Sequence, residues 1–306
     1  MTLKIRAETP ADYDAIDFVE CRAFGRMDEA QLARLMRDTY PAFDPELSIV
    51  AVDRDQINGH TLFMPAPMRM TGATVTALCV VPVCVMPERQ RQGIGGAMLR
   101  HGHRLGGEMG YQFAFLLGHP SYYPRVGYAP TMGSARVNIN VDKLDDPTVQ
   151  LHPMPVADGD IDWLAERCAI EIEDVDFGWL WQPNLLAWSL TGVNSVMWWT
   201  KEGRRAGYTA AGIGADHFAV PLADDPELAC EVIRTIKPRY LEHHPSGWLA
   251  KNAVDPAWSS AEVKFSDAAM AVELQPGLLA AYRKAVARGQ RPLGFVNHPL
   301  PFVILG

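Results

Sequence analysis

The sequence predicts an α+β protein with two domains, 1–145 and 156–306, the first of which holds a mixed, mostly antiparallel sheet flanked by helices. Two observations support this prediction. In the first half, apolar runs of strand length alternate with helical stretches and lead into a strand–turn–helix–strand unit. After about Leu144 the character changes, because Asp145–Pro147 and His152–Pro155 have the composition of a connection between domains.

Local signals define the first elements. Thr9 is a good N-cap residue, Pro10 suits the first helical position and Asp12 is acidic, so a helix begins here and continues to about Phe24. A hairpin with Asn58-Gly59 just inside its return strand follows a second helix. The elements expected in the first half are a strand at Leu3–Ala7, helices at 9–24 and 28–40, a hairpin of Ser48–Asp53 with Ile57–Met64, and strands at Met68–Met70, Thr74–Val85 and Phe113–Leu117.

The stretch Val80–Tyr128 carries the strongest functional signal. An apolar, β-branched strand ends near Val85, and a helix follows from about Ala97 to Met109. Between them lies a basic, glycine-rich turn, Arg89–Gly96. Glycines let a ligand approach the backbone N–H groups at a helix N-terminus, where the helix dipole and the two arginines of the turn favour an anion. The turn therefore predicts a phosphate-binding site.

Two common nucleotide-binding loops do not fit this turn. The NTPase loop closes with Gly-Lys-Ser/Thr, but Gly95-Gly96-Ala97 stands in that place. In the dinucleotide fingerprint the third glycine would fall on Met98. The pattern that does fit is [Arg/Gln]-x-x-Gly-x-[Gly/Ala], which Gln90–Gly95 matches.

This pattern resembles the coenzyme A pyrophosphate loop of the GNAT superfamily of N-acetyltransferases, and its flanks are similar too. Val83–Pro87 looks like the family's fourth strand, and Tyr123–Tyr128 looks like its Tyr-x-x-x-Gly-aromatic segment. Leu117–Pro120, which runs into Tyr122-Tyr123, is most similar to the YhbS-like and enhanced-intracellular-survival-like branches. The resemblance covers about residues 1–140 and implies the GNAT acyltransferase fold, whose element order agrees with the one expected above.

The resemblance also implies acetyl-coenzyme A as the co-substrate. In the family, the backbone of the fourth strand contacts the pantetheine arm and the glycine-rich loop holds the pyrophosphate. The cofactor-binding residues that it implies here are Val83, Cys84, Val85, Arg91, Gln92, Gly93, Ile94, Gly95 and Gly96.

Tyr123 is the catalytic acid that the resemblance implies. Acetyl transfer to an amine needs a neutral amine, a held thioester and a proton for the departing thiolate. A tyrosine with a pKa near ~10 still carries a proton at pH 7. Tyr123 lies four positions before Gly127 and so fits the family's acid, whereas Tyr122 lies five before and does not.

The general base is left open by the sequence. Many members of the superfamily place a glutamate on or near the fourth strand, but Thr74–Met86 contains no acidic residue. His119 follows the fifth strand and is our candidate, because histidine titrates near neutrality. His60 is a weaker candidate, and the terminal carboxylate of Gly306 is a third, by resemblance to the enhanced-intracellular-survival type. A covalent route through Cys84 is not favoured, since cysteine is also a common core residue.

Composition narrows the partners and the location. The net charge of −8 suits a cationic ligand and argues against nucleic acid or an anionic membrane as partners. The five cysteines show no Cys-x-x-Cys spacing, so reduced thiols are expected. The start of the sequence has no apolar signal core, and no apolar run reaches membrane length, which predicts a cytoplasmic protein. His243-His244 and Glu242 have no partner at metal-ligand spacing, so we expect no metal.

The second half echoes the first. Ser195–Trp199 followed by Ala206–Thr209 mirrors the first hairpin, so we expect a degenerate GNAT-like domain. It has no counterpart of the glycine-rich loop, because Gly212–Gly214 lacks the Arg or Gln in register, and we expect it to bind no coenzyme A. It would wall the substrate cleft or mediate homo-oligomerisation. Its further expected elements are helices at 225–236 and 276–287 and strands at 270–274 and 294–304.

The leading functional prediction is an acetyl-coenzyme A-dependent N-acetyltransferase. It would act on a primary amine, either a small cationic molecule or a lysine, by direct attack in a ternary complex. Two alternatives remain open: a coenzyme A-binding sensor or scaffold without catalysis, motivated by the missing carboxylate, and a transferase of a longer acyl group.

Overall fold

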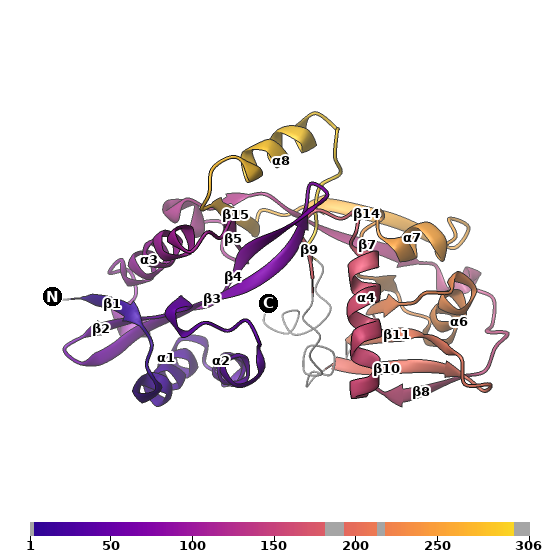
Figure 1. Ribbon diagram of the computed structural model, residues 1–306, viewed down its shortest axis with the longest axis horizontal. Coiled ribbons are helices and arrows are strands. Elements are labelled where there is room, and N and C mark those ends of the chain that lie inside the picture. Colours follow the sequence, from indigo (N-terminus) through magenta and orange to yellow (C-terminus); the bar gives the residue numbers. More distant parts are fainter. Residues whose placement is uncertain (1–2, 181–192, 213–217, 297–306) are drawn as a thin grey trace.

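The computed structural model describes residues 3–180, 193–212 and 218–296, which form two β-sheets side by side along the long axis of the molecule (Figure 1). No helix in these ranges is both long enough and apolar enough to span a bilayer. Short 3-10 helices connect the larger elements, at Pro10–Asp12, Pro45–Leu47, Pro87–Arg89, Tyr123–Val126, Val141–Lys143 and Asp158–Asp160.

The first sheet has the strand order β1-β2-β3-β4-β5-β15-β6, and β9 pairs with the far end of β3. β4 and β5 run parallel, and the other neighbouring strands of this sheet are antiparallel. Its strands are β1 (Lys4–Ala7), β2 (Ser48–Asp53), β3 (Gln56–Met70), β4 (Ala73–Val85), β5 (Phe113–Leu117), β6 (Ala129–Pro130), β9 (Gly178–Trp179) and β15 (Ala269–Glu273).

Helices cover both faces of the first sheet. α1 (Tyr13–Phe24) and α2 (Asp28–Thr39) lie on one face and α3 (Ile94–Glu108) on the other, while α8 (Leu278–Ala287) follows β15. Adjacent residues of β3 point to opposite faces of the sheet. A Cβ on Gly59 would lie 2.8 Å from Met98 of α3, whereas the side chain of His60 bonds to Glu20 of α1. α3 packs closely on the sheet, since a Cβ at Gly102 would lie 2.1 Å from the Phe63 ring.

The second sheet has the order β14-β7-β13-β12-β11-β10-β8. Only β12 and β13 are parallel among its described pairs. Its strands are β7 (Gly133–Ile139), β8 (Leu151–Pro155), β10 (Val193–Thr200), β11 (Arg205–Gly212), β12 (Phe218–Leu222), β13 (Tyr240–Leu241) and β14 (Ser259–Phe265), and its helices are α4 (Ile161–Glu171), α6 (Pro226–Ile236) and α7 (Trp248–Asn252).

Among the described strands, the chain crosses between the sheets four times. It leaves the first sheet after β6 to form β7 and β8, returns for β9 beside β3, leaves again for β10 to β14, and comes back as β15, which lies between β5 and β6. Ala269–Glu273 pairs with Phe113–Leu117 in antiparallel register. The sheets therefore do not divide as the ranges 1–145 and 156–306 do, because β7 belongs to the second sheet and β15 to the first.

A shared apolar core joins the two sheets. Met64 and Phe115 of the first sheet and Trp179 of β9 belong to one buried cluster with Met197 and Tyr208 of the second sheet. The cluster covers the face of the first sheet opposite α3. Burying such large side chains on both sides makes each sheet part of the other's core.

Most of the expected elements are present with small changes in length. The strand at Phe113–Leu117 is confirmed with its bounds. The strands expected at Ile57–Met64 and Met68–Met70 form one strand, β3, in which the stretch around Pro65 pairs with β4 on one side and lies beyond the end of β2 on the other. The strand expected at 294–304 lies largely outside the described residues. In its described part, residues 294–296, a β-bridge joins Phe295 to Gly133.

Candidate active site

The glycine-rich turn leads directly into α3. Gly93 is the N-cap, in the left-handed conformation with φ 82°, and the helix begins at Ile94. Arg91 also has a positive φ, 59°, so the turn coils tightly before the helix. Within the described chain no side chain caps α3, and its first turn contains no acidic residue. The N–H groups of this turn are therefore available to an anion.

Three elements meet at Gly95. A Cβ on this residue would lie 2.5 Å from the hydroxyl oxygen of Tyr122 and 3.6 Å from Cγ2 of Val85. Val85 is the last residue of β4, and Tyr122 comes from the segment after β5. The structure thus brings the expected loop glycine and the expected pantetheine strand together, with Tyr122 rather than Tyr123 directly over the helix start.

Tyr123 lies in the same segment with its ring against Gly118, where an added Cβ would come within 2.2 Å of the ring. Its ring meets those of Tyr122 and Tyr128 edge to face, with centroids 5.1 and 5.7 Å away. Burial, and to a smaller extent Tyr122, raises the pKa of Tyr123 to about 12. The hydroxyl therefore keeps its proton at neutral pH, as a general acid must.

His119 lies in the loop directly after β5. Its carbonyl oxygen accepts hydrogen bonds from the N–H groups of Tyr122, at 3.0 Å, and Tyr123, at 3.4 Å. Its imidazole is exposed to solvent. The main chain of His119 therefore helps to position the two tyrosines, while its side chain faces solvent.

β4 and β5 separate next to the helix start. Their register pairs in the described chain are Leu78 with Ala114 and Cys79 with Phe115, and β4 then continues to Val85. A β-bulge lies close to the separation, because between the pairs Thr61–Val83 and Phe63–Val80 one residue of β3 is matched by two of β4. The edge of β4 that β5 leaves can pair with an extended ligand.

The side chains of the end of β4 alternate between two environments. Val83 and Val85 pack on the α3 side, in the cluster that also includes Tyr122 and Tyr123. Cys84 is buried on the opposite side and donates its thiol hydrogen to the carbonyl of His60, at 3.5 Å. Burial raises the pKa of Cys84 well above its ordinary value, so this thiol is a poor nucleophile.

The arginines near the start of α3 differ in whether they are paired with a carboxylate. Arg89 is paired with Asp53 at 2.7 Å, so it does not supply the free positive charge expected of it. Arg91, Arg100 and Arg125 form no ion pair among the residues that the structure describes. Arg100 approaches the helix start, with Nη1 3.3 Å from where a Cβ on Gly96 would lie. These three side chains are free to meet an anionic ligand; Arg100 and Arg125 were not expected from the sequence.

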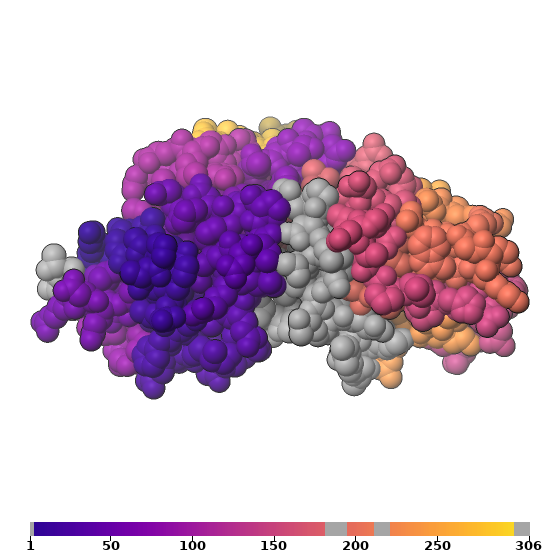
Figure 2. Space-filling model, turned by 60° about the horizontal axis from the view of Figure 1, so that its bottom comes forward, coloured from indigo at the N-terminus to yellow at the C-terminus, as the bar shows by residue number. Residues whose placement is uncertain are grey.

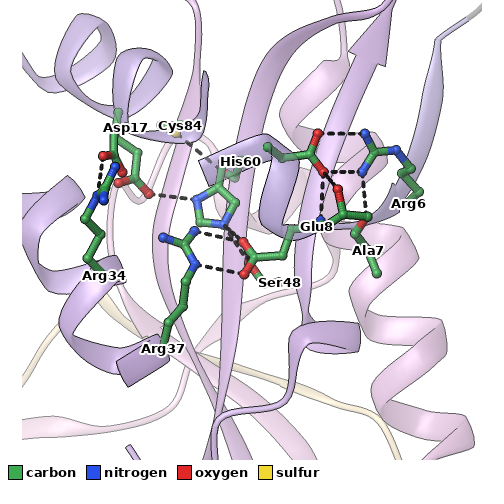
Figure 3. Close-up of polar contacts among 12 residues, drawn as sticks. Arg6, Ala7, Glu8, Asp17, Arg34, Arg37, Ser48, His60 and Cys84 are labelled. Atoms are coloured by element: carbon green, nitrogen blue, oxygen red, sulfur yellow. Dashed lines mark hydrogen bonds and ion pairs between the residues drawn. The ribbon is translucent and has the colours of Figure 1, made fainter. Parts of the chain in front are cut away.

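On the opposite face of β4, five buried or nearly buried side chains form a chain of hydrogen bonds, the His60 network (Figure 3). Arg37 donates two hydrogen bonds of 2.8 Å to the Glu8 carboxylate. Ser48 donates to Glu8, and its Oγ lies 2.9 Å from Nε2 of His60. Nδ1 of His60 lies 2.7 Å from Oε1 of Glu20. The network thereby connects α2, the residue after β1, β2, β3 and α1.

Local sequence patterns explain why these polar groups point inward. Glu20 lies on the buried face of α1 beside Ile16 and Val19. His60 shares the inward-facing parity of β3 with Leu62, and both are buried. A charged residue in the apolar stripe of a helix was the sequence signal for Glu20, which the sequence analysis missed.

Glu20, His60 and Cys84 also form the one group of possible metal ligands found in the described ranges, with donor atoms within 4.8 Å of one another. Two ligands of a tetrahedral zinc ion, each ~2.1 Å from the metal, lie about 3.4 Å apart. The 2.7 Å between His60 and Glu20 is instead a hydrogen-bond distance. The arrangement is therefore better described as a hydrogen-bonded pair.

The other histidine pair of the sequence is engaged elsewhere. Nδ1 of His243 lies 2.8 Å from Oε1 of Glu171, and Nε2 of His244 lies 3.0 Å from the carbonyl of Leu293. Burial raises the pKa of the neighbouring Glu242 to about 7. The carboxylate of Gly306, the third candidate base, lies outside the described residues.

Comparison with known proteins gives a consistent result for the first half. Residues 4–131 match the model of the acetyltransferase (GNAT) domain family. The chain is 38% identical over 124 residues to the uncharacterised N-acetyltransferase YjhQ of Escherichia coli, a match that covers 40% of this chain and 67% of the relative.

Solved structures share the fold over nearly the whole described chain. A GCN5-related N-acetyltransferase from Anabaena variabilis superposes with a TM-score of 0.67 at 12% identity, covering 89% of this chain and 73% of its own. Eis1 from Mycobacterium abscessus gives 0.60 at 14% identity, with 89% and 74% covered. Both sheets therefore have counterparts in proteins of this architecture.

Proposed function

The chain belongs to the GNAT family of acetyltransferases, and we propose that it transfers an acetyl group from acetyl-coenzyme A to a primary amine by direct attack in a ternary complex. One observation carries the proposal. The uncapped N-terminus of α3 lies beside the end of β4, at the place where β5 leaves that strand. A phosphate-binding helix start next to an open strand edge suits a ligand with a pyrophosphate and an extended, amide-containing arm.

Each part of the cofactor has a candidate partner. The N–H groups from Gly93 to Gly96 would hold the pyrophosphate, with Arg91, Arg100 and Arg125 adding positive charge. The backbone of Val83–Val85 would bind the pantetheine arm. Cys84 would contribute main-chain atoms only, because its side chain points to the opposite face.

Tyr123 is the proposed general acid. When the amine nitrogen attacks the thioester carbon, the carbon–sulfur bond breaks and the thiolate takes the proton of the tyrosine hydroxyl. The nitrogen gives up one proton, which returns to the Tyr123 phenolate directly or through a water, so the reaction yields an amide and a thiol. A pKa of about 12 keeps Tyr123 protonated until the thiolate forms.

A cationic acceptor fits the acidic character of the chain. The net charge is −8, and buried carboxylates lie on the α1 and α2 side of the sheet, at Glu20 and Glu29. Small cationic amines and exposed lysines are the two acceptor classes of the proposal. Their order of preference is what an amine panel measures.

The cofactor part is tested by thermal unfolding with coenzyme A, acetyl-coenzyme A and a longer acyl-coenzyme A. At ~100 times the dissociation constant a ligand adds about 2.7 kcal/mol, a shift of several degrees. The variant Gly95→Glu should lose the shift, because its Cβ would lie 2.5 Å from the Tyr122 hydroxyl oxygen, so the side chain would displace Tyr122 and put a carboxylate at the start of α3. Gly159→Glu is the matched control, since nothing lies within 4 Å of a Cβ there. No shift in the wild type with any of the three would refute the proposal.

The transfer part is tested with acetyl-coenzyme A and a panel of histamine, tyramine, spermidine and a lysine peptide, using mass spectrometry of the products. Acetylated amine supports the proposal. Coenzyme A binding without any transfer would favour the sensor or scaffold, and faster reaction with the longer acyl donor would favour an acyltransferase of another chain length.

A further inference from the structure

We propose that Glu20 is the proton acceptor of the transfer reaction, held in place by His60 and, behind it, by Ser48, Glu8 and Arg37. The inference rests on the proposed function, because it names the base of that reaction. It goes beyond it by placing the base on α1, whereas the sequence had suggested His119 or the chain terminus.

The His60 network lies directly behind the proposed pantetheine strand. His60 and Cys84 are register partners on β3 and β4, and their side chains share the face opposite α3. The donor atoms of Glu20 and Cys84 lie within 4.8 Å of each other. A carboxylate of α1 therefore reaches the strand along which the thioester would lie, although β4 itself carries no acid from Thr74 to Met86.

The hydrogen-bond distances fix the protons in the network. Both oxygens of the Glu8 carboxylate accept hydrogen bonds from Arg37, and the Ser48 hydroxyl donates to one of them. Ser48 has no second hydrogen, so at 2.9 Å it accepts one from Nε2 of His60. The hydrogen bonds of Ser48 therefore place a proton on Nε2 of His60.

The contact between His60 and Glu20 then holds one further proton. At 2.7 Å, either Nδ1 donates to an ionised Glu20 or a protonated Glu20 donates to Nδ1. The two groups thus share a single transferable proton, a carboxylate–imidazole pair of the kind used for general acid–base catalysis. Removing His60 would leave the carboxylate buried without its partner.

The second oxygen of Glu20 has an open position. Oε2 is buried and has no hydrogen-bond partner among the described residues. Buried polar atoms are normally bonded, so an unbonded carboxylate oxygen points to a group that arrives from outside the chain. A water molecule or the ammonium group of the acceptor could donate the hydrogen bond that this oxygen lacks.

The proton balance of the step is simple. The acceptor enters as an ammonium ion and gives one proton to Glu20 Oε2, directly or through a water. The neutral amine attacks the thioester carbon, the carbon–sulfur bond breaks, and the thiolate takes the proton of Tyr123. The second proton leaves the nitrogen and reaches the Tyr123 phenolate, directly or through a water. Glu20 then releases its proton to solvent. Glu20 is the catalytic residue here, whereas His60, Ser48 and Glu8 are positioning residues.

Other ionisable groups surround Glu20 and shape its response to pH. Arg37 faces it from α2, Cys21 from α1 itself and Cys84 from β4. Glu29 offers a matched control because it too is buried, at 3% exposed, but hydrogen-bonds to Arg26 instead of a histidine.

The test compares Glu20→Gln with Glu29→Gln in the full chain, using the best amine of the panel. The amide keeps the size of the carboxylate and can still bond to Nδ1 of His60, with its oxygen as acceptor or its nitrogen as donor, but it cannot take up a proton. We expect kcat/KM at pH 7 to fall on the order of 10²-fold in Glu20→Gln, since general base catalysis is worth roughly 10² to 10⁴. The deficit should shrink as pH rises and the free amine becomes abundant. Coenzyme A affinity should be unchanged.

Several outcomes would overturn the proposal. A purely structural network would lower the melting temperature of Glu20→Gln and leave its rate per folded molecule and its pH profile intact. A larger, pH-dependent loss in Glu29→Gln would assign the base to α2 instead. If the wild type binds coenzyme A but transfers to no amine, the proposed function fails and this inference fails with it.

A measurement without substrate distinguishes failure of the inference about Glu20 from failure of the proposed function. Nitrogen-15 NMR of the imidazole in the resting protein should show a proton on Nε2 of His60. It should also show Nδ1 changing in Glu20→Gln but not in Glu29→Gln. A His60 with a bare Nε2 would contradict the proton assignment, whatever the activity.

Discussion

The ring of Tyr123 lies against the backbone of Gly118, so closely that a methyl group on Gly118 would come within 2.2 Å of it. The proposed acid is thus oriented by a residue that has no side chain. The same segment places the Tyr122 hydroxyl over Gly95.

Gly118→Ala should therefore lower activity by displacing the Tyr123 ring. We expect kcat to fall on the order of tenfold to 10²-fold, as for other small misplacements of a catalytic group. Coenzyme A binding should persist, which a thermal shift would show. Gly159→Ala, with open space around it, is the control. Wild-type kcat in Gly118→Ala would mean that the ring position does not matter.

Tyr123→Phe should reduce turnover by about 10²-fold or more, with little change in acetyl-coenzyme A affinity. Tyr122→Phe is the matched control, because Tyr122 lies one residue earlier with its hydroxyl at the start of α3. If Tyr122→Phe loses turnover and Tyr123→Phe does not, the acid is Tyr122.

The raised pKa of Tyr123 also makes a prediction about alkaline pH. Because its pKa is about 12, the hydroxyl keeps its proton well above pH 10, where an ordinary tyrosine loses it. The kcat profile should show no alkaline decline up to the limit of protein stability. A decline centred near pH 9 or 10 would assign the acid to a group with a lower pKa.

Removing one partner of the buried ion pair in the His60 network should cost much stability. The side chains of Arg37 and Glu8 are 5% and 0% exposed, so Arg37→Leu leaves a buried carboxylate unpaired. We expect a loss of about 3–5 kcal/mol in urea unfolding. Arg104→Ala, which breaks an exposed pair with Glu108, should cost about 0–1 kcal/mol. Equal losses in both variants would contradict the burial argument.

Acid should weaken the fold through His103. Burial, with a smaller effect of Arg100, lowers the pKa of His103 to about 4, while the unfolded value is near 6.5. Between these values the unfolded chain binds the proton and the folded chain does not, so stability falls as pH drops from 6.5 to 4. His103→Gln should flatten urea-unfolding free energies over this range. Tyr128→Phe removes the 3.0 Å contact between the tyrosine hydroxyl and Nε2 of His103 but keeps the buried imidazole. Its free energy of unfolding should therefore still fall between pH 6.5 and 4.

The local part of the fold could be predicted from the sequence. The strand Phe113–Leu117 and the glycine turn before α3 depend on residues adjacent in the chain. The strand was predicted with its bounds, and the turn was predicted in the right place, although α3 begins at Ile94, three residues before the expected Ala97. The pairing of β15 with β5 could not be predicted, because it joins segments far apart in the chain whose apolar patterns fit many partners.

The candidate site divides in the same way. Gly95, Val85 and Tyr123 were expected from a motif. The structure places Gly95 beside Val85 at the start of α3, and Tyr123 next to Tyr122 in the segment that covers it. His60 and Glu20 are 40 residues apart, and each alone resembles an ordinary polar residue on an apolar face. Only the packing of α1 on β3 reveals that they are a pair.

The pairing of β5 with β15 also has a consequence for folding during synthesis, because β15 is made long after β5. When β6 has been made, β5 is paired with β4 on one edge only, and the ribosome must add the whole second sheet before Ala269–Glu273 can pair with the other edge. At ~5–20 residues per second this takes on the order of ten seconds, during which the nascent chain exposes an unpaired strand edge. That interval is when a chaperone would have most to protect, and slow codons between β7 and β14 would lengthen it.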